Sequence, residues 1–258
     1  MELTKEKNIK KLSKNIKFHK KTMKLTETDI KELYKFTRQH YVYFYDVQTE
    51  LVDHLANDIE NIWIEKPNLS FEQARDISFK KFGIFGFMDV VEKKQNEMNK
   101  KYFKTILRFA KEWFRLPKII LTTLIVIVFY YIQELPNAYY TYVSIYSFII
   151  ISEAIVLIIN KKKSRKQFKA TGKKWMFQNI IQINGIGNSV LIIFYVFKFS
   201  VQNNAQDFLL LGNFSRILSA LVISVVLILG YIILIVIPQK AEELLEETYP
   251  EYKLSKNL

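Results

Sequence analysis

The stretch Pro117–Pro238 constrains the fold of this 258-residue chain more than any other part, because it holds four long apolar segments. An α-helix rises about 1.5 Å per residue, so about 20 apolar residues are needed to cross the hydrocarbon of a bilayer. Helices of water-soluble proteins usually keep a polar face, and the first, second and fourth segments have almost none. The stretch therefore predicts four membrane-spanning helices, at Ile119–Leu135, Ala138–Asn160, Trp175–Phe197 and Ile217–Ile237.

Lysine and arginine flank these segments unequally. Seven basic residues lie between positions 100 and 118 and eight lie between positions 161 and 174, whereas the turn Pro136-Asn137 and residues 202–207 carry none. Positive charge gathers on the cytoplasmic side of membrane proteins. We therefore expect a bacterial inner-membrane protein with both termini and the 161–174 loop in the cytoplasm, next to anionic lipid headgroups. The same rule accounts for much of the formal charge of +13, which makes nucleic acid an unlikely partner.

The first 25 residues form a basic tail with little apolar content. Residues 1–24 contain nine lysines and two glutamates, a composition that is typical of disorder. Three alternatives remain open: an arm that binds a membrane surface or nucleic acid, a solvated tail, and a start at Met23 rather than Met1. We favour a dispensable tail.

Residues 26–95 predict a small cytoplasmic helical module. Thr26 and Ser70 each stand three positions before Asp29 and Gln73, the arrangement of a capping box at the start of a helix. The helix between them carries one apolar stripe, made of Val47, Leu51, Leu55, Ile59 and Ile62. Residues 96–116 mix aromatic with basic side chains and predict a juxtamembrane amphipathic helix. Residues 239–258 predict a cytoplasmic acidic tail.

The helix VQTELVDHLANDIE, the segment LSFEQARDISFKKFG and the transmembrane block after them resemble the HAAS-type module, also seen as the permease prefix domain of bacterial membrane proteins. The resemblance covers residues of about 27–95. It implies a cytoplasmic helical module fused to membrane helices, of a type associated with permease components and PadR-type transcription regulators. It implies no catalytic residues. Lys66-Pro67-Asn68 stands where the family usually has a glycine-bearing loop.

No hydrolase, kinase or metalloprotease motif is present, so we expect no enzymatic activity, no catalytic residue and no cofactor. The chain has no cysteine, which excludes disulfides and cysteine-ligated metals. Glu50, His54 and Asp58 follow one another at intervals of four residues, but a metal site usually needs about four ligands, so we expect no metal. We expect instead a hydrogen bond between His54 and Asp58, which makes them a polar pair of the partner-binding module.

The third apolar segment carries polar side chains, and the second carries Glu153. Gln178 and Gln182 fall on one narrow face together with Gly185 and Ser189, while Asn184 and Asn188 point away from it. Glu153 lies seven residues before Asn160, about 10 Å from the cytoplasmic boundary at 1.5 Å per residue. Gln182 has the same depth when counted from Trp175.

These depths predict that Glu153 faces the third segment at the level of Gln178 to Gln182. The candidate intramembrane polar site comprises Glu153, Gln178, Gln182, Asn184 and Asn188. An ionisable group in hydrocarbon is costly and often functional. The alternative, which we favour, is a set of hydrogen bonds that join helices, each worth about 0.6 kcal/mol.

The sequence thus predicts an all-α fold, a small cytoplasmic helical domain joined to a four-helix transmembrane bundle. The function we favour is regulatory or scaffolding, with a protein partner bound through the helical module. One alternative is a small transporter or permease component that uses Glu153 and the polar face of the third segment. The other is a membrane-tethered nucleic-acid binder that uses the basic tail. The sequence identifies neither the partner, nor a transported ligand, nor the oligomeric state.

Overall fold

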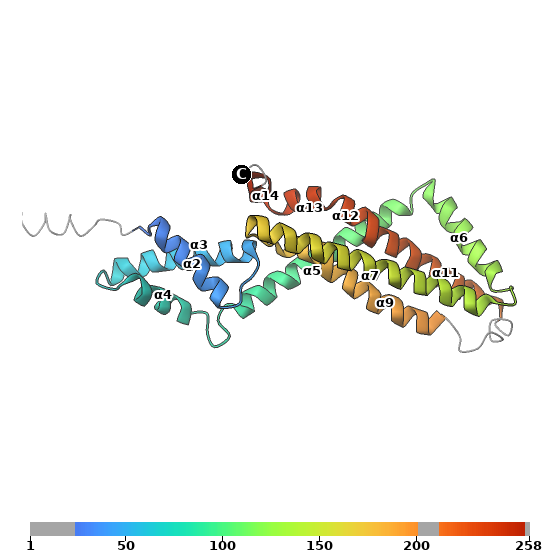
Figure 1. Cartoon of the computed structure of the whole chain (residues 1–258), viewed down its shortest axis with the longest axis horizontal. Helices are drawn as coiled ribbons and strands as arrows, with labels where there is room; N and C mark the ends of the chain where they lie inside the picture. Colours follow the sequence, from blue (N-terminus) through green and yellow to red (C-terminus); the bar gives the residue numbers. More distant parts are fainter. Residues whose placement is uncertain (1–23, 201–211, 256–258) are drawn as a thin grey trace, which may run out of the picture. The chain divides into compact units, whose positions relative to one another are not determined.

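The computed structural model describes residues 24–200 and 212–255, except the side chains at positions 184, 188, 190, 197–200 and 253–255. In that part of the chain every regular element is a helix and none is a strand (Figure 1), which confirms the predicted all-α fold. The chain divides into two compact units, residues 1–93 and 94–258. The basic tail before residue 24 lies outside the described residues.

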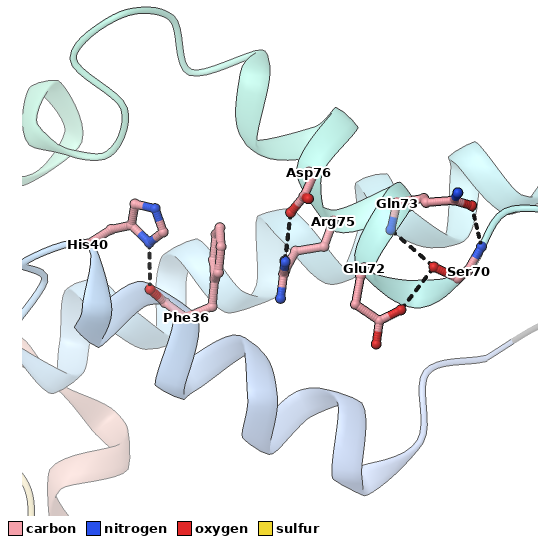
Figure 2. Close-up of polar contacts among 7 residues, drawn as sticks. All are labelled: Phe36, His40, Ser70, Glu72, Gln73, Arg75 and Asp76. Carbon is pink, nitrogen blue, oxygen red and sulfur yellow. Dashed lines mark hydrogen bonds and ion pairs between the residues drawn. The ribbon is translucent and has the colours of Figure 1, made fainter.

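The first unit is built from α2 (Glu27–Gln39), α3 (Tyr45–Glu65), α4 (Phe71–Lys80) and the start of α5 (Met88–Trp113). Both predicted capping boxes are present, at the start of α2 and of α4. Figure 2 shows the second box, in which the backbone N–H of Gln73 donates to the Ser70 hydroxyl and the Gln73 side chain accepts from the Ser70 backbone. The boxes satisfy backbone donors that have no partner within the helix, and so define where α2 and α4 begin.

The predicted apolar stripe of α3 forms the core of this unit. Val47, Leu51, Leu55 and Ile59 are completely buried. Leu33 of α2 and Ala74 of α4 close the same core from the two neighbouring helices. Each side chain of this size contributes about 1.5–3 kcal/mol when it leaves water, so the stripe fixes how the three helices pack.

Helix α5 runs without a break across the predicted boundary between residues 95 and 96. It meets α6 (Lys118–Ile132) at an angle of 90°. Pro117 precedes the first residue of α6, and a proline cannot extend the preceding helix. The Trp113 indole N–H donates to the Thr122 hydroxyl at 3.1 Å and its ring lies 5.3 Å from that of Tyr231, contacts that hold the bend.

The first predicted span needs a correction, because α6 ends at Ile132 instead of Leu135 and has 15 residues. At 1.5 Å per residue it is about 22 Å long, shorter than a hydrocarbon core of about 30 Å. Three described helices are each long and apolar enough to cross a membrane, and α5 with α6 makes a fourth only if the bent pair is one span.

The described part of the second unit contains these three long helices, and consecutive ones are antiparallel neighbours (Figure 1). The first is α7, Ala138–Thr171. The second is the continuous run of α8 (Met176–Asn179), the π-helix η1 (Ile180–Asn184) and α9 (Gly185–Ser200). The third is the run of α11 (Asn213–Tyr231), the π-helix η2 (Ile232–Val236) and α12 (Ile237–Gln239). Figure 1 shows α7, in yellow-green, running alongside α9, in orange.

Polar contacts tie α6, α7 and α11 together at the end of the bundle that holds the α6–α7 turn. The Gln133 amide donates to the Arg216 carbonyl at 3.0 Å, and the Arg216 guanidinium pairs with Glu134 at 3.3 Å. The Tyr142 hydroxyl donates to the Phe129 carbonyl at 3.0 Å. These bonds pair polar groups that would otherwise meet hydrocarbon.

The acidic C-terminal segment packs at the opposite end of the bundle as α13 (Ala241–Thr248) and α14 (Pro250–Ser255). The Tyr249 ring lies 4.8 Å from the Trp175 ring, and its hydroxyl accepts from the Phe177 backbone N–H at 3.1 Å. The segment therefore covers the start of α8.

Candidate functional site

A row of polar side chains lines the side of α7 that faces α8, η1 and α9. Glu153, Asn160 and Gln167 follow one another at intervals of seven residues. Seven residues make nearly two helical turns, so the three side chains lie on one face, about 10.5 Å apart. They form the first half of what we call the polar seam.

The other half of the polar seam comes from the neighbouring helix. The Ser189 hydroxyl donates to Glu153 Oε1 at 2.9 Å. The Asn160 side-chain amide donates to the Gln182 backbone carbonyl at 3.1 Å, and the Gln178 amide donates to Gln167 Oε1 at 2.9 Å. The polar seam is thus a ladder of three contacts between two antiparallel helices.

The structure places Glu153 towards the third apolar segment, but opposite Ser189 rather than opposite Gln182. The expected depth match is wrong by seven residues, because Asn160 is the residue that lies opposite Gln182. The apolar stretch of α7 ends at Asn160, yet the helix itself continues to Thr171. Helix pairing follows the helix end and the short loop after it, not the end of the apolar stretch.

Glu153 is completely buried, and its Oε2 atom has no hydrogen-bond partner among the described residues. The Ser189 hydroxyl also lies 2.7 Å from the Ile186 carbonyl, so one hydroxyl hydrogen serves two acceptors. This arrangement suits both forms of the acid. A carboxylate accepts the serine hydrogen, whereas a neutral carboxyl donates to the serine oxygen while the serine donates to Ile186.

The π-helix η1 lies within the polar seam and contains Gln182. In a π-helix the backbone bonds run from i to i+5, and such turns occur often at functional sites. The Gln182 carbonyl uses a lone pair to accept from Asn160, while the Gln182 side-chain oxygen is buried without a partner among the described residues. The polar seam therefore contains buried acceptors at Glu153 and Gln182 that the described part of the protein leaves unsatisfied.

The polar seam ends in a cavity of about 560 Å³, which we call the Lys-lined cavity. Gln167, Gln178 and Gln182 belong to both the polar seam and the cavity wall, and Lys163 and Lys166 of α7 also line the cavity. The arrangement connects a basic cavity to a buried carboxyl through polar groups on one helix interface.

The structure does not place all the predicted residues of this site. The side chains of Asn184 and Asn188 lie outside the described part of the chain. Conversely, sequence reasoning did not assign Asn160 and Gln167 to the site. The signal that would have found them is the seven-residue spacing that they share with Glu153.

The predicted bond between His54 and Asp58 in the helical module is wrong. Asp58 pairs instead with Lys81, with Oδ1 and Nζ 2.6 Å apart, while His54 is exposed. Burial acts to raise the pKa of Asp58, but hydrogen bonds from Lys81 and Ser78 outweigh it and hold the pKa below its ordinary value. Asp58 thus stabilises the contact between α3 and α4 and is not free to bind a ligand. Among the described residues no three His, Cys, Asp or Glu side chains are grouped as metal ligands.

The clearest exposed apolar feature of the module is the loop Gly83–Gly86, where Ile84 is 100 % exposed and Phe85 is 71 % exposed. Both glycines have positive φ, 77° and 56°, which other residues rarely adopt. The Gly86 N–H donates to the Gly83 carbonyl at 3.3 Å, and the Met88 N–H donates to the Phe85 carbonyl at 3.2 Å. The loop therefore presents two apolar side chains in a defined conformation.

The loop Gly83–Gly86 packs on an aromatic cluster. Phe87 is buried, and its ring lies 4.8 Å from Phe79, 4.9 Å from Phe82 and 5.9 Å from His40. Figure 2 shows His40 beside Phe36, whose carbonyl lies 2.8 Å from His40 Nδ1. A Cβ atom at Gly86 would lie 3.1 Å from the Phe79 ring, so the loop sits directly on the cluster.

Comparisons with known proteins assign neither arrangement to a family. No protein-family model, curated protein or solved structure matches the chain. The resemblance of residues 27–95 to the HAAS-type module therefore rests on the sequence pattern alone.

The two arrangements differ in what they can do. The polar seam can hold a proton or a small polar ligand away from lipid, because a buried carboxyl and carbonyl oxygens supply acceptors there. The loop Gly83–Gly86 can offer an apolar surface to a partner, because Ile84 and Phe85 are exposed on a backbone that two hydrogen bonds hold.

Proposed function

We propose that this chain is a multi-pass inner-membrane protein with a regulatory or scaffolding role and no catalytic activity. Its residues 26–95 bind a protein partner at the cytoplasmic face and so hold that partner at the membrane. The single observation that carries the proposal is the loop Gly83–Gly86, with Ile84 and Phe85 exposed and the backbone ordered. The resemblance to the HAAS-type module and the lysine distribution support the cytoplasmic position.

An apolar side chain held in a fixed position binds a partner with little further loss of conformational freedom. Ile84 and Phe85 are also the only consecutive pair of large apolar residues in the described module that are both more than 70 % exposed. In many protein interfaces a few side chains that become buried against the partner contribute most of the binding free energy. The expected partner surface is therefore an apolar groove or pocket on a soluble or membrane protein.

The test is photo-crosslinking in cells that express the full chain. A photoreactive phenylalanine analogue in place of Ile84 should give a discrete protein adduct. The same analogue in place of Ile64, which is 77 % exposed at the end of α3, is the matched control and should give none. The adduct should disappear when Gly86→Val disturbs the loop. Adducts to lipid alone, or equal protein adducts at both positions, would contradict the proposal.

A second candidate is a small carrier that uses Glu153, and the unpartnered Oε2 atom of that buried carboxyl favours it. Flux of protons or monovalent cations into proteoliposomes that contain the full chain would test it. Transport requires that Glu153→Gln abolishes flux while the protein stays folded. Absence of flux from the unaltered chain would leave the polar seam with a structural role.

A further inference from the structure

The Lys-lined cavity lies where α7, α8, η1 and α12–α14 meet, and its volume of about 560 Å³ is within the range of about 300–1,000 Å³ usual for ligand pockets. We propose that this cavity binds the headgroup of an anionic phospholipid and that Lys163 and Lys166 hold its phosphate. The proposal rests on the proposed membrane location but not on the partner-binding role.

The charge of the cavity favours an anion. Lys163 and Lys166 are three residues apart on α7, so their side chains project from one face towards one opening. Neither forms an ion pair with any described residue, whereas two acidic residues of α13 are engaged, Glu243 with Lys240 at 2.8 Å and Glu247 with Arg108 at 3.8 Å. Glu242 is the acidic residue of the wall, so the two lysines outweigh it.

Amide groups complete a site for a phosphate ester. Gln178 and Gln239 line the cavity, and each side-chain amide carries two N–H donors. One donor of Gln178 is used by Gln167, which fixes the position of the amide and leaves the other donor for a ligand. Lysine charges supplemented by oriented N–H donors are a recurrent way of holding phosphate oxygens.

The depth of the cavity favours a lipid over a soluble anion. The apolar stretch of α7 ends at Asn160, and Lys163 and Lys166 lie three and six residues beyond it, about 4.5 and 9 Å along the helix. The headgroup region adds about 5–8 Å on each side of the hydrocarbon, so the Lys163 backbone stands within it and the Lys166 backbone at its outer edge, where both long side chains are within reach of lipid phosphates. Basic pockets between membrane helices are known to bind such headgroups.

The surface of α7 that leads away from the lysines suits acyl chains. Ile155, Ile158 and Ile159 are between 52 % and 57 % exposed on the turns just before Asn160. A lipid whose phosphate occupies the cavity would place its chains against this apolar surface. A free phosphate ion would gain nothing from it, so the two sources of phosphate differ in expected affinity.

The test uses the full chain purified in mild detergent, with retained lipid measured by native mass spectrometry. Phosphatidylglycerol and phosphatidylcholine are the probes, and inorganic phosphate and glycerol 3-phosphate are the competitors. The unaltered protein should retain phosphatidylglycerol in preference to phosphatidylcholine. Inorganic phosphate and glycerol 3-phosphate at millimolar concentration should not displace it.

The deciding variant is Lys163→Gln with Lys166→Gln, and its matched control is Lys161→Gln with Lys162→Gln, which removes the same charge from residues outside the cavity wall. Two phosphate-bound lysines predict about 30-fold weaker retention of phosphatidylglycerol for the first variant. The control pair should retain the lipid normally. Lys163→Arg with Lys166→Arg keeps both positive charges and should keep most of the affinity, so a loss in the glutamine pair is due to the charges and not to substitution as such. Circular dichroism checks that each variant is folded.

Equal losses in the two lysine-to-glutamine pairs would overturn the proposal, because they would indicate attraction by the whole basic loop. Displacement by inorganic phosphate would also overturn it, in favour of a free-anion site. If the chain is absent from the membrane fraction, the proposed function fails as well. If the chain is in the membrane and gives its Ile84 adduct but retains no anionic lipid, only this inference fails.

Discussion

The two units of the chain, described over residues 24–93 and over residues 94–200 and 212–255, are both helical there, yet their helices select packing faces by different means. In the first unit, α3 buries one apolar stripe and exposes charged residues on the other side. In the second, α7 is apolar on nearly every side from Ala138 to Asn160. Its buried face is marked instead by Tyr142, Tyr146 and Glu153.

The difference follows from the solvent that each unit is built for. In water, leaving an apolar side chain exposed costs about 25 cal/mol for each Å², so the stripe must face the core. In lipid an isoleucine gains little by turning inward, so polar and small side chains decide which face meets a neighbour. An exposed apolar position should therefore tolerate a charge in the first unit and respond to it with a large loss in the second.

The largest expected effect is the loss of the first unit's core through Leu55→Asp. Leu55 is completely buried, and a carboxylate there would have no partner. The cost should match the whole stability of a domain of about 70 residues, roughly 4–10 kcal/mol. Circular dichroism of a fragment of residues 24–93 should show a helical unaltered fragment and an unfolded variant. Asn57→Asp at an exposed site of α3 is the control, and it should leave the fragment folded.

The second prediction compares exposed positions directly. Phe148 in the middle of the α7 apolar stretch is 72 % exposed, and Ile64 of the first unit is 77 % exposed. If Phe148 faces lipid, Phe148→Asp should cost about 3 kcal/mol and reduce membrane insertion. Ile64→Asp should change stability by less than about 0.5 kcal/mol. Similar small effects at the two positions, in insertion assays and thermal unfolding, would mean that α7 is not surrounded by lipid.

The third prediction concerns glycines that face neighbouring helices. A Cβ atom at Gly185 would clash with the Tyr102 ring of α5, whereas one at Gly187 would lie 3.7 Å from Leu157, an ordinary contact. Gly185→Ala should therefore be about 1–2 kcal/mol less stable than Gly187→Ala, because helix propensity favours both changes equally. Thermal unfolding of the two variants in detergent measures the difference. Equal stability would show that α5 does not pack against α9 as described.

The smallest expected effects lie in the polar seam. Ser189→Ala removes the donor to Glu153 and should cost about 0.6 kcal/mol, the average for a hydrogen bond between membrane helices. Glu153→Gln should be nearly silent in stability, since its amide can donate to the Ser189 oxygen while Ser189 donates to Ile186. Unfolding in detergent measures both. A loss of several kcal/mol in Glu153→Gln would show that the negative charge itself stabilises the bundle.

Features encoded within one helix could be predicted from the sequence. The capping boxes at Thr26 and Ser70 and the buried stripe of α3 depend on residues within one or two turns, and the structure has them as expected. That Glu153 faces the third apolar segment could also be predicted from the sequence, because a carboxyl group avoids hydrocarbon.

Features that depend on how helices are joined could not be predicted in the same way. The register that sets Glu153 opposite Ser189 is decided by the extension of α7 to Thr171 and by the short loop after it. The 90° bend before α6 depends on the packing of Trp113 against α6 and α11. In the sequence, Pro117 indicates that a helix ends there, but it does not indicate this packing or the angle. The Lys-lined cavity forms only when α13 and α14 fold against the bundle. In the sequence alone, Lys163 and Lys166 therefore indicated only the orientation in the membrane.

The central claim is that the helices of residues 118–239 cross a membrane with the lysine-rich ends on one side. The absence of native cysteine makes single-cysteine labelling the most direct test. Asn137→Cys in the α6–α7 turn and Lys162→Cys near the other end of α7 are both exposed. In intact cells a membrane-impermeant maleimide should label Asn137→Cys, and it should label Lys162→Cys only after the membrane is permeabilised. Labelling of Lys162→Cys in intact cells, or equal labelling of both variants, would contradict the account.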